Sequence, residues 1–114
     1  MATIYHNPRC SKSRQTLELI KTQGVEPSIM LYLDTPLSGQ DIAELLKKLG
    51  ISARQLLRRG EQAYKEQNLA DSSLTEEQLI EAMVKTPKLI ERPIVVNGDK
   101  AIIGRPPEQV LEIL

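Results

Sequence analysis

The chain has 114 residues, of which 40% are hydrophobic, which is enough for one domain to bury a core without metal or disulfide support. Its 15 Lys and Arg side chains balance its 15 Asp and Glu side chains, and only 3% of its residues are aromatic, so the composition argues against binding nucleic acid or an anionic membrane. A single cysteine excludes an internal disulfide, and the sequence shows neither a charged leader nor an apolar run of the roughly 18 residues that span a bilayer, so we expect a protein of the reducing cytoplasm.

The first third of the chain predicts a strand, a helix and a second strand. Residues 2–5 have the pattern of a short strand, and residues 11–23 have the spacing of a helix that Gly24 is suited to end in a left-handed conformation. Residues 28–33 form a nearly continuous apolar run, which is typical of a strand covered on both faces. We therefore expect a right-handed parallel strand–helix–strand unit.

The middle of the chain changes to a helical pattern. One helix has apolar side chains at positions 42, 45, 46 and 49, and it lies between a capping box of Ser38 with Asp41 and a stop at Gly50. A short helix is expected over residues 52–59. We interpret the apolar stripes of the helices in this region as core faces rather than as ligand-binding surfaces.

A further helix is expected before the chain returns to strands. Thr75 with Gln78 marks its start, and Pro87 ends it. Residues 94–96 and 101–103 are then apolar on either side of an Asn-Gly pair, which predicts a β-hairpin. A closing helix is expected to start at Pro106-Pro107 and to dock through Val110, Leu111 and Leu114.

The expected hairpin places two arginines opposite each other at one end of its strands. If Gly98 and Asp99 form its loop, Arg92 lies opposite Arg105, and other loop lengths move this match by only one or two residues. Like charges that face each other across two strands are destabilising, so the two side chains either point into water or share an anion. Each arginine precedes a proline, which favours extended backbone and limits how the guanidinium can swing. A bidentate oxyanion clamp is therefore an alternative to two solvated arginines.

The only cysteine, Cys10, stands where a strand gives way to a helix. A lone cysteine is often an inert small hydrophobe. Here, however, the first turn of a helix favours an anion, and Arg9, Lys12 and Arg14 add positive charge. This combination predicts a functional thiolate.

The neighbours of this cysteine can support it. Ser11 and Ser13 can donate hydrogen bonds to a thiolate or to a bound oxyanion, and His6 can stabilise or orient the sulfur. One cysteine and one histidine cannot complete a metal site, so we expect none. Because Ser13 occupies the place of the second thiol in a Cys-x-x-Cys pair, an external thiol has to complete any redox turnover.

Five motifs spread over nearly the whole chain carry a family resemblance. In order, they are His6-Asn7-Pro8-x-Cys10-Ser11-x-Ser13-Arg14, Leu31-Tyr32-Leu33, Leu56-Leu57-Arg58, Arg92-Pro93-Ile94-Val95-Val96 and Gly104-Arg105-Pro106. Together they resemble the glutaredoxin-dependent arsenate reductase family. The resemblance implies an α/β, thioredoxin-like fold with a mixed sheet. It also implies one domain over residues 1–114, in the order β-α-β, helical insertion at about 36–86, and β-β-α.

The resemblance also implies an oxidoreductase that turns arsenate into arsenite. Cys10 would be the nucleophile that forms a cysteinyl-arsenate adduct, and Arg58, Arg92 and Arg105 would hold the oxyanion. Arg59 follows Arg58 directly, so the pattern leaves open which of the two faces the site. Glutathione would attack the adduct, and glutaredoxin would then remove the glutathione. Glutathione is thus a co-substrate, and no bound cofactor is expected.

Other residues near the nucleophile take their roles from the same resemblance. His6 and Ser13 match residues that favour the thiolate, and Asn7 matches a position that shapes its loop. Ser11 and Arg14 complete the expected substrate-binding set. A cis peptide bond is implied between Arg92 and Pro93.

Two other functions fit the same fold. One is a regulator that contacts RNA polymerase, and the other is a thiol transferase linked to glutathione. The paired arginines beside a single cysteine favour the enzyme. The sequence contains no coiled-coil repeat, so we expect a monomer.

Overall fold

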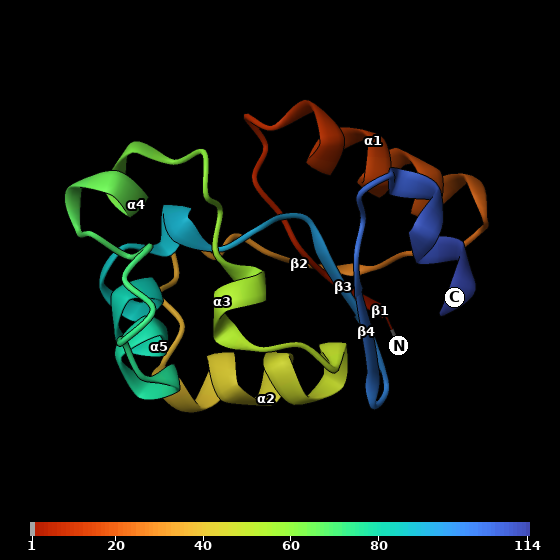
Figure 1. The fold of residues 1–114 in the computed structure, drawn as a ribbon. Helices are drawn as coiled ribbons and strands as arrows, with labels where there is room; N and C mark the ends of the chain where they lie inside the picture. The colour runs from red at the N-terminus through yellow and green to blue at the C-terminus, as the bar shows by residue number, and fades with distance from the viewer. Residues whose placement is uncertain (1) are drawn as a thin grey trace. The chain divides into compact units, whose positions relative to one another are not determined.

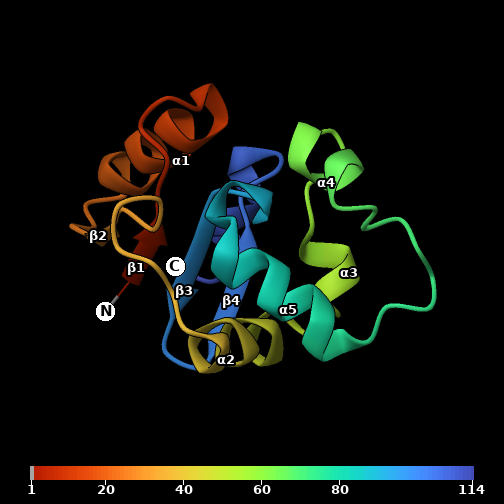
Figure 2. The same cartoon turned by 90° about the vertical axis from the view of Figure 1, so that its left-hand side faces the viewer.

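The computed structural model describes residues 2–114, which divide into two compact units. The first contains the chain up to Thr35 together with Arg92–Leu114, and the second is Pro36–Glu91. Figures 1 and 2 show the secondary structure of both units from two directions.

The first unit is built on a mixed sheet of four strands. The strands are β1 (Ala2–Tyr5), β2 (Ser28–Met30), β3 (Ile94–Asn97) and β4 (Lys100–Ile103), and their order across the sheet is β2-β1-β3-β4. β1 pairs with β2 in parallel and with β3 in antiparallel fashion, and β3 pairs with β4 as a hairpin. The expected α/β class, the parallel strand–helix–strand unit and the mixed sheet are confirmed.

One helix of the first unit, α1 (Ser11–Thr22), contacts the short 3₁₀ helix η2 (Pro107–Glu112). Apolar side chains from α1, η2 and the two central strands, Ile4, Ile20, Val95 and Val110, form a buried cluster. Gly24 follows α1 with a φ of +78°, which is the left-handed stop expected from the sequence. Burial of the cluster fixes α1, and with it the residues at its N-terminus, to the sheet.

The second strand is shorter and more exposed than the sequence suggested. We expected a strand over residues 28–33 that is covered on both faces, but β2 ends at Met30 and pairs only with β1 at the edge of the sheet. Ile29 is 48% exposed. After β2 the chain turns, and the Leu31 carbonyl accepts hydrogen bonds from the backbone N–H groups of Asp34 and Thr35. The apolar run therefore crosses from a strand into a turn.

The hairpin has the register expected from its Asn-Gly signal. Asn97 pairs with Lys100, and Gly98 lies in the loop with a φ of +67°. Beyond the paired strands, the Gly104 N–H donates to the Pro93 carbonyl at 2.9 Å. The same register brings Arg92 opposite Arg105.

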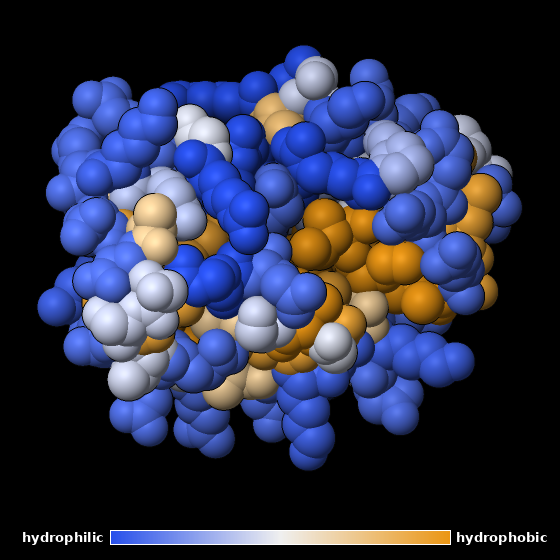
Figure 3. All heavy atoms as spheres, viewed as in Figure 1, coloured by the Kyte–Doolittle hydropathy of each residue, from blue (hydrophilic) through white to orange (hydrophobic). Residues whose placement is uncertain are grey.

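The C-terminal segment differs from the expected docking helix. η2 is a 3₁₀ helix, and Val110 is its buried anchor, whereas Leu111 and Leu114 are 42% and 36% exposed. In a 3₁₀ helix residues three apart share a face, so Pro107 and Val110 are buried together and Leu111 points elsewhere. Figure 3 shows hydrophobic atoms at the surface over β4 and η2.

The second unit consists of helices. They are α2 (Gly39–Leu49), α3 (Ala53–Leu56), α4 (Gln62–Glu66), α5 (Glu76–Lys85) and the 3₁₀ helix η1 (Pro87–Leu89). Capping boxes start α2, α3 and α5, and those at Ser38 and Thr75 were expected. Gly50 ends α2 in the left-handed conformation, as expected.

Two elements of the helical unit depart from expectation. The helix expected over residues 52–59 is the shorter α3, because Leu57 pairs with Ile90 in an isolated β-bridge. The chain then leads through Arg58, whose N–H donates to the Leu89 carbonyl at 2.8 Å. α4 was not expected, since its one buried residue, Ala63, leaves no apolar stripe to detect. Within residues 2–114 no helix combines the length and the apolar character needed to cross a membrane.

Candidate active site

Cys10 occupies the N-cap of α1. Its backbone is extended, its N–H donates to the Asn7 carbonyl at 3.0 Å, and its carbonyl accepts the first bond of the helix from the Arg14 N–H at 3.0 Å. The side chain is 9% exposed. The sulfur therefore stands where the unpaired N–H groups and the dipole of α1 favour a negative charge, as the sequence predicted.

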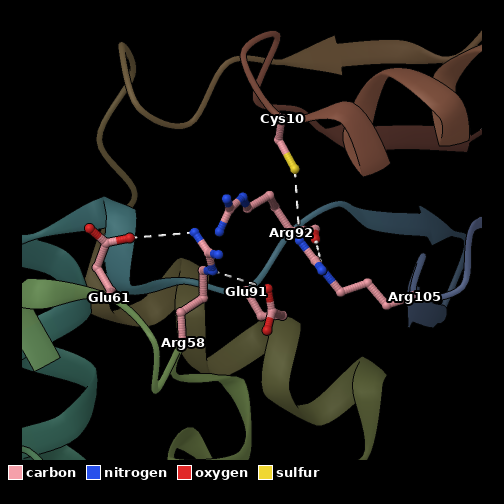
Figure 4. A network of polar contacts seen from close by, with 6 residues as sticks. All are labelled: Cys10, Arg58, Glu61, Glu91, Arg92 and Arg105. Atoms are coloured by element: carbon pink, nitrogen blue, oxygen red, sulfur yellow. Dashed lines mark hydrogen bonds and ion pairs between the residues drawn. The ribbon is translucent and has the colours of Figure 1, made fainter.

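Arg105 is the charged partner of this sulfur. Its Nη2 donates to Cys10 Sγ at 3.7 Å, and its Nε donates to the Arg92 carbonyl at 2.8 Å (Figure 4). The second bond fixes Nε of the guanidinium to the neighbouring strand end, and Nη2 lies toward the sulfur. The structure thus unites two features that the sequence predicted separately, the cysteine at the helix start and the arginines of the hairpin.

The backbone around the two arginines holds them at this end of the hairpin. The peptide bond between Arg92 and Pro93 is cis, as the resemblance implied, and that between Arg105 and Pro106 is cis as well. Gly104 precedes Arg105 and lies directly against α1, where a Cβ atom would come 2.8 Å from Thr16 Oγ1. Neither the second cis bond nor the role of Thr16 was expected from the sequence.

His6, Ser13 and Asn7 form a buried polar network under the nucleophile loop. His6 Nδ1 lies 2.6 Å from Ser13 Oγ, and the Asn7 N–H donates to the same oxygen at 3.0 Å. Burial lowers the pKa of His6 below its usual 6.5, and the positive charges of Arg14 and Lys21 lower it further. The imidazole is therefore neutral near pH 7, and its Nδ1 shares a hydrogen bond with the Ser13 hydroxyl.

In this network the side chain of Ser13, which lies in α1, holds the loop before Cys10. The hydroxyl hydrogen-bonds with His6 Nδ1 and accepts a hydrogen bond from the Asn7 N–H. Ser13 is fully buried, whereas Ser11 and Arg14 are exposed. Ser13 thus holds the backbone that leads to Cys10.

Two side chains shape the loop directly before Cys10. Asn7 Oδ1 accepts a hydrogen bond from the Arg9 N–H at 3.0 Å, and Arg14 Nη1 donates to the Pro8 carbonyl at 2.9 Å. The bond made by Arg14 ties the loop to the first turn of α1.

Arg58 belongs to the helical unit, where it lies between two carboxylates. Its Nη1 is 3.4 Å from Glu61 Oε2, and its Nε is 3.4 Å from Glu91 Oε1 (Figure 4). Its side chain is partly exposed, whereas Arg59 is exposed. The two glutamates were not among the expected site residues, although Glu61 follows Arg58 at the i,i+3 spacing of a helical ion pair.

No group of three or more histidine, cysteine, aspartate or glutamate side chains that could hold a metal ion is found among residues 2–114.

The chain matches the ArsC family model over residues 5–113. It is 66% identical to the uncharacterized protein YfgD of Escherichia coli, with 97% of this chain and 94% of that protein covered. It is 52% identical to a protein of Haemophilus influenzae named arsenate reductase, with 97% of each chain covered.

A solved structure supports the same relationship. The arsenate reductase from Vibrio cholerae is 52% identical and superposes with a TM-score of 0.97 over 99% of this chain and 97% of that one. The expected thioredoxin-like fold is confirmed by this match. On these grounds the chain belongs to the ArsC family.

Proposed function

We propose that this protein is an oxidoreductase that reduces arsenate to arsenite through an adduct on Cys10. The observation that carries this proposal is the contact between Arg105 Nη2 and Cys10 Sγ at the N-cap of α1. A guanidinium beside a sulfur at a helix start can bind an oxyanion that approaches that sulfur. The relatives named arsenate reductase supply the identity of the oxyanion.

The first step joins sulfur to arsenic. Arg92 and Arg105 neutralise the charge of the bound arsenate, and the Cys10 thiolate attacks the arsenic atom. A sulfur–arsenic bond forms, one arsenic–oxygen bond breaks, and the released oxygen leaves as water after it takes up protons. Arsenic remains pentavalent at this stage.

The second step needs an outside thiol, because the chain contains no second cysteine. The thiolate of glutathione attacks Cys10 Sγ, and the electron pair of the sulfur–arsenic bond passes to arsenic. Arsenic gains two electrons and leaves as arsenite, while the two sulfur atoms lose one electron each and form a mixed disulfide. Glutaredoxin then takes the glutathionyl group and restores the Cys10 thiol.

The remaining site residues hold this arrangement. His6, Ser13 and Asn7 position the loop that carries Cys10, and Arg14 ties that loop to α1. Ser11 is exposed at the first turn of the helix, where its hydroxyl can donate to the oxyanion. The need for glutathione places the protein in a reducing compartment such as the cytoplasm, where it acts as a monomer.

The test is a coupled assay with purified protein, arsenate, glutathione and glutaredoxin, in which arsenite is measured directly by separation of the two arsenic species. Wild-type protein should release arsenite and Cys10→Ser should release none. Turnover by the Cys10→Ser variant at the wild-type rate would overturn the mechanism. A glutathione mixed disulfide offered in place of arsenate distinguishes an arsenate reductase from a general thiol transferase.

A further inference from the structure

A pocket of about 250 Å³ lies beside the loop that leads to Cys10, within the sheet-bearing unit. One wall consists of residues 6–9, and the other consists of Leu31, Leu33 and Asp34 in the turn after β2. The two leucines are 37% and 39% exposed, although Tyr32 between them is buried. The turn thus presents two large aliphatic side chains to a space beside the nucleophile loop.

The charges around this pocket differ from those around the cysteine sulfur. Arg9 and Asp34, both exposed, line the pocket from its two different segments. His6 also lines the pocket, and its lowered pKa keeps it neutral near pH 7. The charges of the lining therefore cancel. A bare oxyanion meets no net positive charge here, whereas the γ-glutamyl end of a peptide such as glutathione, with one ammonium and one carboxylate group, meets a partner for each.

The position of the pocket relates it to the second step of the proposed reaction. Arg9 is bonded to Cys10, so their Cα atoms are about 3.8 Å apart, and an extended tripeptide spans roughly 10 Å. A peptide with one end in the pocket is therefore long enough to extend past Arg9 toward residue 10. Because the chain has no second cysteine, a thiol that resolves an adduct on Cys10 has to be held from outside.

We propose that this pocket is the subsite for the reductant, and that it takes a small peptide thiol with an α-ammonium and an α-carboxylate group, such as glutathione. The α-carboxylate lies beside Arg9, the α-ammonium group lies beside Asp34, and the aliphatic part packs against Leu31 and Leu33. This assignment rests on the proposed function, since only a thiol-dependent reaction at Cys10 requires the subsite. It separates the reductant from the oxyanion, which binds at the arginines of the hairpin.

The first experiment measures binding without turnover. Isotope-labelled wild-type protein is titrated with S-methylglutathione, which has no free thiol, and backbone amide shifts are followed by NMR. The largest saturable shifts should fall on residues 6–9 and 31–34. Shifts that are absent, or that centre on the hairpin residues instead, overturn the assignment. This titration needs no arsenate, so it decides the ligand of the pocket even if the protein reduces none.

The second experiment separates the two substrates kinetically. Arg9→Gln and Asp34→Asn should each raise the KM for glutathione about 2- to 5-fold, the range for an exposed ion pair, and Asp34→Asn should leave the KM for arsenate and the kcat at saturating glutathione unchanged. Asp99→Asn is the matched control, because it removes an exposed carboxylate from the hairpin loop of the same unit. An unchanged KM for glutathione in both pocket variants overturns the proposal while leaving arsenate reduction itself intact.

Discussion

Gly104 lies so close to Thr16 that a Cβ atom at position 104 would come 2.8 Å from Thr16 Oγ1 and 3.1 Å from Thr16 Cγ2. Thr16 cannot easily turn away, since it is fully buried and its hydroxyl donates to the Lys12 carbonyl at 2.8 Å. Thr16 lies on the helix that Cys10 caps, and Gly104 directly precedes Arg105. The close approach of these two residues therefore sets the distance between the sulfur and its guanidinium.

Replacing Gly104 with alanine should accordingly damage both stability and the site. We expect Gly104→Ala to lower the free energy of unfolding by about 1–3 kcal/mol, as overpacking does. We also expect it to raise the KM for arsenate, because Arg105 is displaced from Cys10. Denaturant unfolding and steady-state kinetics check the two effects.

Two further variants make this prediction specific. Gly60→Ala is the matched control, because a Cβ there meets nothing within 4 Å and should change little. Thr16→Ala removes both close Thr16 atoms, so adding it to Gly104→Ala should recover part of the lost stability. Strict additivity of the two substitutions would contradict the assigned contact.

An oxyanion should stabilise the folded protein through the hairpin arginines. A ligand that binds only the native state at 100 times its Kd adds about 2.7 kcal/mol, so arsenate or sulfate should raise the Tm. Arg105→Gln should abolish most of that shift, because it removes the group that faces Cys10 Sγ. Lys100→Gln removes a positive charge from the other end of the hairpin and should preserve the shift. Equal shifts in both variants, measured by differential scanning fluorimetry, would show that the anion binds elsewhere.

The lowered pKa of His6 predicts a dependence of stability on pH. The unfolded chain takes up a proton near pH 6.5, whereas the native imidazole takes it up only at a lower pH. Above pH 6.5, His6 should not lower the free energy of unfolding. As the pH falls from 6.5 to the lower pKa of the native imidazole, the free energy of unfolding should decrease. His6→Asn keeps a side chain that can hydrogen-bond with the Ser13 hydroxyl, and it should flatten this part of the profile.

The measurement is unambiguous because His6 is the only histidine of the chain. Its imidazole signals can be followed by NMR without assignment, while urea unfolding supplies the stability at each pH. A midpoint at or above 6.5 in the native protein, or an unchanged slope in the variant, would refute the buried neutral imidazole.

Adjacent arginines in the helical unit allow a paired comparison. The family resemblance assigns the oxyanion to Arg58, which is partly buried and lies between Glu61 and Glu91, whereas Arg59 is exposed. Arg58→Lys keeps the charge but loses the planar fork, so it should raise the KM for arsenate about tenfold, the factor that corresponds to about 1.4 kcal/mol. Arg59→Lys should leave it unchanged. A larger effect at Arg59 would reassign the role.

Local sequence signals predicted the parts of this fold that depend on local geometry. The capping boxes at Ser38 and Thr75, the left-handed stops at Gly24 and Gly50 and the hairpin register were all expected, because each depends on a few neighbouring residues. The length of β2 was not predicted correctly, because an apolar run does not reveal whether its strand lies at an edge or at the centre of the sheet.

In the candidate site, too, the features that depend on neighbouring residues were predicted from the sequence, and a contact between distant residues was not. The sequence placed Cys10 at the start of a helix and Arg92 opposite Arg105, but no local pattern relates residue 10 to residue 105. That contact depends on how α1 and the hairpin pack on a common sheet, and only the family resemblance anticipated it. Thr16 was also missed, because a buried threonine within a helix is indistinguishable in sequence from an exposed one.

Because Cys10 is the only cysteine, each oxidised form of this protein differs from the reduced chain by the mass of the group bound to that one sulfur. With one sulfur able to form a disulfide or an adduct, every oxidised form has to retain a foreign group, and each such group adds its own mass to the intact chain. A glutathionyl, an arsenical or an oxygen adduct can therefore be read from a single mass spectrum of quenched protein. The intact mass therefore identifies the step of the proposed reaction at which the protein was quenched.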